Sequence, residues 1–539
     1  MIRPILLPAA ASLALALAAA PAQAAGTLVV CTEASPALFN PQHSISATDF
    51  DVGAQVYDEL VETERGSSKL LPALAESWSV APDGLSATFH LRHNVPFHAS
   101  PIFKPTRPMN ANDVMFSFAR QMNDKDPYHA VGGGAYIEWD SLLRDRVAGI
   151  VKVDDDTVRF DLKEPISSLL GILSMQSFAI QSAEYAAAML KAGTPDKVDT
   201  DPIGTGPFSF VHYQRDSDVR FRAFPGTWTK AAGLADRVAG VDSLVFTIAP
   251  DPAVRLAKLR VGECQIARYP NPADFDAIRA DKNLSLASAP MASMGYIAFL
   301  ANQPPFDKVE VRQALAMAID LKSLVASVFQ GTGTPTAAMI SPALWGHNDH
   351  IGLRPYDPAA ARALLAKAGY PNGFHTQLWA IPVIRAYMPN GRRAAEMIQA
   401  DWAKIGVTAD IVTYEWGEYL RRVRNSEAPV GMLGGTWDYP DPSQIVYGYW
   451  ACPNGVPRPG DWSRWCNAEF TDLVARANVI SDQAQRSVLY QKAQEVFARE
   501  VPAVLFADTQ AYTAVRKGVV GYKVHVLGGT PFAGVSVAP

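Results

Sequence analysis

Long apolar runs are missing from most of this chain. A helix needs about twenty uncharged apolar residues to cross a bilayer, and no such stretch occurs after residue 24. An excess of basic residues is missing too, because 48 Lys and Arg stand against 53 Asp and Glu and give a formal charge of −5. A phosphate backbone attracts basic proteins, so this balance argues against a nucleic-acid partner.

Motifs for catalysis are also absent. The chain has no Gly-x-Ser-x-Gly elbow, no His-Glu-x-x-His pair and no phosphate-binding loop. Pro202–Phe208 contains glycines but lacks the other parts of such a loop, and we interpret it as a turn between domains. The histidines of His347–His350 are not at helical spacing, which favours a polar turn over a metal site. The sequence therefore argues against an enzyme and predicts no metal or cofactor.

The first 24 residues differ from the rest. Arg3 precedes an apolar run from Ile5 to about Ala20, and Ala22–Ala24 supplies the small-x-small pattern of a cleavage site. These features are typical of a secretory signal peptide that is cut after Ala24. A lipid-anchored protein would carry its cysteine directly after small residues, whereas Cys31 follows Leu-Val-Val. We therefore expect export of a soluble mature chain.

Cysteine is scarce, with four in the whole chain and no Cys-x-x-Cys pair. In an exported protein four cysteines suggest two disulfides, for which three pairings are possible. Cys452 and Cys466 enclose a loop rich in Pro, Gly and Trp that has little regular structure to hold it. A local Cys452–Cys466 bridge is the economical choice, and it leaves Cys31 to pair with Cys264.

The stretch Leu74–His98 predicts a β-hairpin. Apolar residues alternate with polar ones on both sides of a Pro-Asp-Gly turn. The order Leu-Ala-x-Ser-Trp, Asp-Gly, Thr-Phe-x-Leu-Arg and Val-x-Phe-His in this stretch resembles the peptide/nickel family of periplasmic solute-binding proteins. Members of that family deliver ligands to ABC importers, so the resemblance implies a carrier in the periplasm.

Strands and helices alternate to the end of the chain without internal repeats, which indicates a mixed α/β architecture. The resemblance covers the whole mature chain and implies a two-lobed periplasmic-binding-protein type II fold with an additional inserted domain. The expected divisions are a signal peptide at 1–24, a core of lobe I at 25–57 with 205–295 and 505–539, an inserted domain at 58–204, and lobe II at 296–504. The hinge is expected near 290–300 and 500–510.

Two further segments, Leu378–Leu420 and Met432–Pro442, resemble the dipeptide-binding members of the family. A free dipeptide is a zwitterion whose charges lie about 7 Å apart at full stretch. The resemblance assigns its α-ammonium to Asp438 and its α-carboxylate to Arg385, whose planar guanidinium suits a carboxylate. Without the resemblance, a solvated surface role would be favoured for both side chains.

Several neighbours of these residues complete the predicted ligand site. A strand followed by a loop brings Ser35 near a cleft, and Gly435 lies three residues before Asp438. Trp437 stands where the dipeptide-binding proteins carry glycine, which would narrow one pocket. The aromatic residues near the two charges are Tyr387, Trp416, Trp437 and Tyr439, for which core packing is an equal alternative to lining the ligand.

The resulting prediction is a monomeric periplasmic protein that captures dipeptides by hinge closure and delivers them to the permease of an ABC transporter. The same carrier role for haem, an oligopeptide or another small solute stays open, because one fold serves many ligands.

Overall fold

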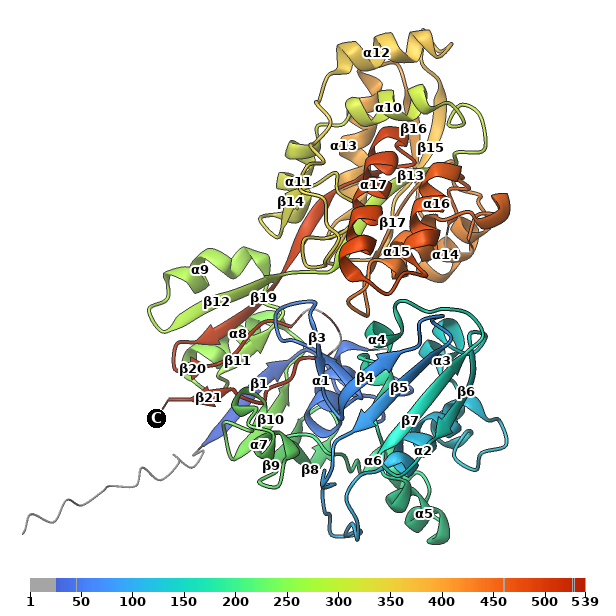
Figure 1. The fold of residues 1–539 in the computed structure, drawn as a ribbon. Helices are drawn as coiled ribbons and strands as arrows, with labels where there is room; N and C mark the ends of the chain where they lie inside the picture. The colour runs from blue at the N-terminus through green and yellow to red at the C-terminus, as the bar shows by residue number, and fades with distance from the viewer. Residues whose placement is uncertain (1–25, 45, 459–460, 526, 528, 539) are drawn as a thin grey trace, which may run out of the picture.

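The structure is a computed structural model of the chain and describes residues 26–44, 46–458, 461–525, 527 and 529–538. The signal peptide expected at 1–24 lies outside the described residues. Figure 1 shows mixed helix and sheet in two lobes, with α1 to α9 in the lower lobe and α10 to α17 in the upper lobe. We call these the first and the second lobe.

The first lobe is built on an eight-stranded sheet. Its strands in spatial order are β12 (Leu284–Pro290), β19 (Ala507–Arg516), β11 (Ile266–Arg268), β1 (Thr27–Thr32), β10 (Ser243–Ile248), β9 (Asp218–Ala223) and β8 (Phe208–Gln214), with β14 (Gly333–Pro335) paired to β19. The strands β1, β10 and β11 run parallel, and the outer pairings are antiparallel. Segments from both ends of the chain therefore meet in one sheet.

The second lobe is built on a five-stranded sheet. Its order is β16 (Thr408–Val412), β15 (His375–Trp379), β17 (Val430–Thr436), β13 (Ser293–Phe299) and β18 (Ala503–Leu505). The chain passes from β12 of the first sheet to β13 of this one at residues 291–292, and it returns from β18 to β19 at Phe506. Both crossings fall within the segments expected to form the hinge; the domain boundaries and the hinge role stay predictions.

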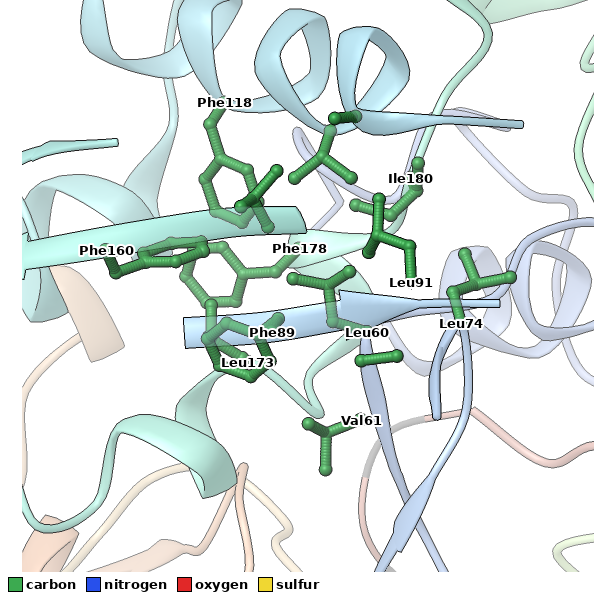
Figure 2. Packing of buried hydrophobic residues seen from close by; sticks show 14 of the residues in the cluster. Leu60, Val61, Leu74, Phe89, Leu91, Phe118, Phe160, Leu173, Phe178 and Ile180 are labelled. Carbon is green, nitrogen blue, oxygen red and sulfur yellow. The ribbon is translucent and has the colours of Figure 1, made fainter. Parts of the chain in front are cut away.

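A four-stranded antiparallel sheet forms a separate part of the first lobe. Its order is β4 (Ala75–Val80), β5 (Ser86–Leu91), β7 (Thr157–Leu162) and β6 (Val147–Lys152). The β4–β5 pair confirms the predicted hairpin, although Val80 at its tip is exposed. Phe89 and Phe160 pack edge to face with centroids 5.4 Å apart, and Phe118 lies against Phe160 (Figure 2). Two short ribbons pair β2 (Val61–Thr63) with β3 (Leu70–Pro72) and β20 (Val519–Val520) with β21 (Ser536–Val537).

Helices cover the sheets, and their starts follow local capping rules. In the described residues they are α1 (Ala47–Val56), α2 (Ala111–Met122), α3 (Ile137–Leu142), α4 (Leu169–Ile172), α5 (Ala183–Lys191), α6 (Lys197–Thr200), α7 (Trp228–Ala231), α8 (Pro252–Val261), α9 (Phe275–Ala280), α10 (Val309–Met317), α11 (Leu321–Phe329), α12 (Pro358–Lys367), α13 (Gly391–Ala403), α14 (Trp416–Arg424), α15 (Ser443–Trp450), α16 (Ala468–Ala477) and α17 (Gln483–Glu500). Asp357 caps α12, where an Asp-Pro start favours a helix. Asn110 and Asp113 form a capping box at α2.

Both predicted disulfides are confirmed. Cys31–Cys264 joins β1 to the segment before β11 across 233 residues of sequence, and Cys452–Cys466 closes a local loop. Among the described residues, no helix combines the length and apolar character required to span a membrane.

The lobes also touch away from the crossings. Tyr439 from the second lobe is buried in the apolar core of the four-stranded sheet, beside α4. A Cβ on Gly171 of α4 would lie 3.4 Å from the Tyr439 ring. Tyr439 therefore packs against the opposite lobe, whereas Tyr387 and Trp437, which are also buried, belong to the apolar cores of the second lobe.

Candidate functional site

A cavity of about 330 Å³ lies where the two lobes face each other. The first lobe contributes residues of α1, the segment 57–65 and Glu138 of α3, and the C-terminal part adds His525, Leu527, Gly529, Pro531 and Ala533. The second lobe contributes Thr436, Trp437 and Asp438 at the end of β17. The carboxyl end of this strand, where the pairing with β13 stops, therefore points functional side chains at the first lobe.

Asp438 is held in the cavity by one partner. Its backbone N–H donates to Gln444 Oε1 at 2.8 Å, and Gln444 Nε2 donates back to Asp438 Oδ2. Gln444 belongs to α15, so a helix fixes the carboxylate that the loop carries. Asp438 is exposed to solvent, and partial desolvation by the neighbouring walls raises the pKa of its carboxyl group, whereas the bond from Gln444 lowers it. Such a carboxylate is poised to accept a cation.

Trp437 lines the same cavity and is buried. Its indole Nε1 has no hydrogen-bond partner in the part of the chain that the structure describes. Gly435 lies one position before Thr436 on β17, where a Cβ would come within 3.3 Å of Ile445 and 3.6 Å of Tyr449. The indole therefore forms this wall of the cavity, whereas Gly435 does not line it and faces Ile445 and Tyr449.

Arg385 does not line the cavity. It lies in a tight turn in which its backbone and that of Met388 exchange hydrogen bonds of 3.1 and 2.9 Å. The guanidinium lies 5.2 Å from the ring centroid of Trp416 and donates to the carbonyl of Ile384. Trp416 in turn stacks on Tyr419 at the start of α14. Trp416 thus supports Arg385 from the side of α14.

Two tyrosines link the surroundings of the two charged residues. Burial raises the pKa of Tyr387, and the neighbouring Arg385 lowers it. Burial also raises the pKa of Tyr449, with further contributions from the charges of Asp438 and Tyr387. The structure therefore brings Tyr387 beside Arg385 and Tyr449 beside Asp438, without a direct contact between the two charges.

Tyr387 rests on a pair of glycines that face each other in the sheet. Gly295 of β13 is in register with Gly434 of β17. A Cβ on Gly295 would lie 2.0 Å from the Tyr387 carbonyl oxygen, and one on Gly434 would lie 2.4 Å from the Tyr387 ring. Only glycine lets the turn that carries Arg385 approach the sheet this closely.

Substitution Gly434→Ala tests this packing. We expect a loss of about 1–3 kcal/mol in stability, because the new methyl group overlaps both Tyr387 and the β13 backbone, together with weaker ligand binding as the Arg385 turn is displaced. Gly149→Ala on β6 is the matched control, since nothing lies within 4 Å of its Cβ position. Urea unfolding of both variants measures the difference, and equal midpoints would contradict the packing argument.

Ser35 is not brought into the cavity. Its hydroxyl donates to Asp216 Oδ1 at 2.8 Å and accepts from the Asp216 N–H at 2.8 Å. Asp216 lies in the turn between β8 and β9. Ser35 therefore fixes that turn in this structure, and its predicted ligand contact stays a prediction.

The first-lobe wall carries acidic residues that sequence reasoning missed. Burial, with the charge of Asp438, raises the pKa of Glu138 to about 7, so Glu138 faces Asp438 from the other lobe. Glu59 and Glu62 line the cavity from the segment before and within β2. The run Asp58-Glu59-Leu60-Val61-Glu62 was a usable signal, because two apolar residues divide its acids. Glu138 gave no comparable signal, since only folding brings it here.

A polar, largely acidic cavity between two mixed α/β lobes, joined by strand crossings, defines a two-lobed binding protein. Residues 69–456 match the family described as bacterial extracellular solute-binding proteins, family 5 Middle. The chain belongs to this family of solute-binding proteins, as its sequence motifs predicted.

Relatives of known name agree with this assignment. The chain is 45% identical to the dipeptide-binding protein of Escherichia coli over 516 residues, which cover 95% of each chain. It is 40% identical to heme-binding protein A of Haemophilus influenzae, over 95% of this chain and 92% of that protein. The structure of HbpA2 from Haemophilus parasuis is similar with a TM-score of 0.91 and 39% identity, covering 95% of this chain and all of that one. The predicted fold class is confirmed.

Proposed function

We propose that this protein binds a free dipeptide between its lobes and delivers it to an ABC transporter permease. The observation that carries the proposal is the Asp438 carboxylate, held by Gln444 at the wall of a cavity between the lobes. This carboxylate is exposed at the cavity wall, where it can accept hydrogen bonds from the α-ammonium of a peptide. The 45% identity to a dipeptide-binding protein supports this choice of ligand.

Arg385 is the proposed partner of the ligand α-carboxylate. Its guanidinium donates to one backbone carbonyl and lies beside Tyr387. A guanidinium has five donors, so several stay available for a carboxylate. Because Arg385 lies outside the cavity lining, the proposal requires the ligand to extend past Tyr387 and Tyr449, or the lobes to move together.

The proposal also covers the oligomeric state, the compartment and the lack of a chemical step. The protein acts as a monomer in the periplasm after removal of residues 1–24, binds its ligand without changing it chemically, and needs no cofactor. The lobes, with the boundaries given from the sequence, close about the crossings at residues 291–292 and 506.

Haem is the second candidate ligand, favoured by the 40% identity to a heme-binding protein. Haem carries two propionate groups and no ammonium, so the carboxylates of Asp438 and Glu138 would repel it. Titration calorimetry with alanyl-alanine, its N-acetylated form, trialanine and haem separates the candidates. We expect binding of the free dipeptide and loss of binding after acetylation. Equal binding of the acetylated peptide would contradict the zwitterion site. Binding of haem without binding of any peptide would show that haem, and not a dipeptide, is the ligand.

Lobe closure is tested by small-angle X-ray scattering. We expect saturating dipeptide to lower the radius of gyration, because the ligand enters the cavity between the lobes and the connections between the sheets are short. The Asp438→Ala variant at the same peptide concentration is the control and should keep the unliganded profile. Identical profiles of the wild-type protein with and without peptide would count against closure.

A further inference from the structure

We propose that the cavity recognises a second cationic group, so that the protein prefers peptides with a lysine or arginine side chain, and that Glu59 is the residue that pairs with this group. The inference rests on the proposed function, since it takes the ligand of the cavity to be a peptide.

Glu59 is an acid that is buried and yet lines a cavity. Only 9 % of its surface is exposed, and it lies in the wall of the cavity between the lobes. The next two residues, Leu60 and Val61, fill the apolar core of the four-stranded sheet (Figure 2). This anchoring holds Glu59 at the boundary between the core and the cavity. Among the described residues, the Glu59 carboxyl group accepts only from its own backbone N–H and forms no ion pair.

The neighbouring acids differ from Glu59 because each has partners. Asp58 Oδ2 accepts from Thr205 Oγ1 at 2.7 Å and from Trp228 Nε1 at 2.8 Å. Glu62 forms a 2.6 Å ion pair with Arg237. Burial without a counter-ion disfavours the ionised form of such an acid, so a ligand that supplies a cation at the cavity wall stabilises the carboxylate.

The charge of the cavity also favours a cationic side chain on the ligand. Its ionisable lining residues are Asp58, Glu59, Glu62, Arg65, Glu138, Arg237, Asp438 and His525. Burial lowers the pKa of His525 to about 4, so this histidine is uncharged at neutral pH. The five acids outnumber the two arginines, of which Arg237 is already paired, although burial raises the pKa values of Glu62 and Glu138 to about 7 and leaves both partly protonated at neutral pH. A zwitterion adds no net charge, whereas a lysine or arginine side chain complements the acidic excess.

The two carboxylates lie on different lobes. Asp438 belongs to the second lobe and Glu59 to the first, and both line one cavity. A peptide whose α-ammonium pairs with Asp438 would therefore reach the other lobe through its side-chain cation. Such a ligand pairs with a carboxylate of each lobe.

Protonation provides an independent signature. Burial raises the pKa of Glu59 well above its ordinary value, and the charges of Asp58 and Glu62 raise it further. A bound cation favours the ionised form and lowers this pKa again. Binding of a cationic peptide should therefore release a proton, and its affinity should fall as the pH drops through the raised pKa of Glu59 in the free protein.

The experiment compares side chains of equal length with and without the charge. Alanyl-lysine and alanyl-norleucine are titrated calorimetrically into the full mature chain, at pH 7 in buffers of different ionisation enthalpy. We expect the wild-type protein to bind the lysine peptide about tenfold more tightly or better, with additional proton release. Glu59→Gln should bring the affinity for alanyl-lysine down to that for alanyl-norleucine and remove the additional proton release. Glu64→Gln, an exposed acid just beyond β2, is the matched control and should behave as wild type.

The outcomes are distinguishable. Equal wild-type affinities for the two peptides would overturn this inference and leave the dipeptide function intact. Equal loss of both peptides in Glu59→Gln would show a structural role for Glu59 and overturn it as well. Failure of the wild-type protein to bind either peptide would overturn the proposed function and this inference with it.

Discussion

Replacement of Asp438 by alanine is expected to lower the affinity for a dipeptide by about two to three orders of magnitude. The reason is that the ligand α-ammonium would be desolvated in the cavity without its partner, and truncating one member of a buried charge pair costs about 2–5 kcal/mol. Calorimetric titration with alanyl-alanine measures the loss.

Controls separate the charge from the shape of the site. Asp438→Asn removes the charge but keeps a side chain that can bond to Gln444, so it should lose nearly as much affinity as the alanine variant. Asp349→Ala removes an exposed carboxylate of the same lobe and should bind as wild type. Normal dipeptide affinity in Asp438→Ala would show that the ligand ammonium lies elsewhere.

Local patterns in the sequence predicted much of the fold. The β4–β5 hairpin follows from alternation around one turn, and the start of α12 follows from Asp357 and Pro358. The two disulfides follow from pairing Cys452 with Cys466, which closes a short loop that has little regular structure of its own. The hairpin and the helix start depend on residues that are close together in the sequence. The disulfide pairing depends on one choice, the local bridge, which leaves the other two cysteines to pair.

The candidate site was only partly predictable because its walls come from distant segments. Family resemblance identified Asp438, which lines the cavity. It did not identify Glu59 or Glu138, which meet Asp438 only after the lobes fold together. The position of Arg385 outside the cavity depends on a close approach between its turn and two sheet glycines, and no spacing in the sequence encodes that contact.

The loop that carries Asp438 depends on a second acid, Asp441, three residues later. Arg486 of α17 binds both Asp441 carboxylate oxygens at 2.8 Å, and both residues are buried. The same guanidinium donates to the Ala477 carbonyl and covers the ring of Trp345. It also reaches the Ser167 carbonyl of the first lobe at 3.4 Å. One buried pair therefore fixes the loop and the contact between the lobes.

Asp441→Ala should accordingly destabilise the protein by about 3–5 kcal/mol, because it leaves Arg486 buried without a counter-ion. Ligand affinity should fall with it, since Asp438 loses its fixed position. Urea unfolding followed by tryptophan fluorescence measures the stability, and Trp345 lies against the altered group.

The double variant Asp441→Ala/Arg486→Met distinguishes an unpaired charge from a lost contact. Removing both charges should recover most of the stability, because an apolar side chain tolerates burial that a lone guanidinium does not. Asp472→Ala breaks the exposed pair with Arg476 on α16 and should change stability by at most about 1 kcal/mol. If the double variant were as unstable as Asp441→Ala, the loop would depend on the geometry of Asp441 itself, and the buried charge would not explain its effect.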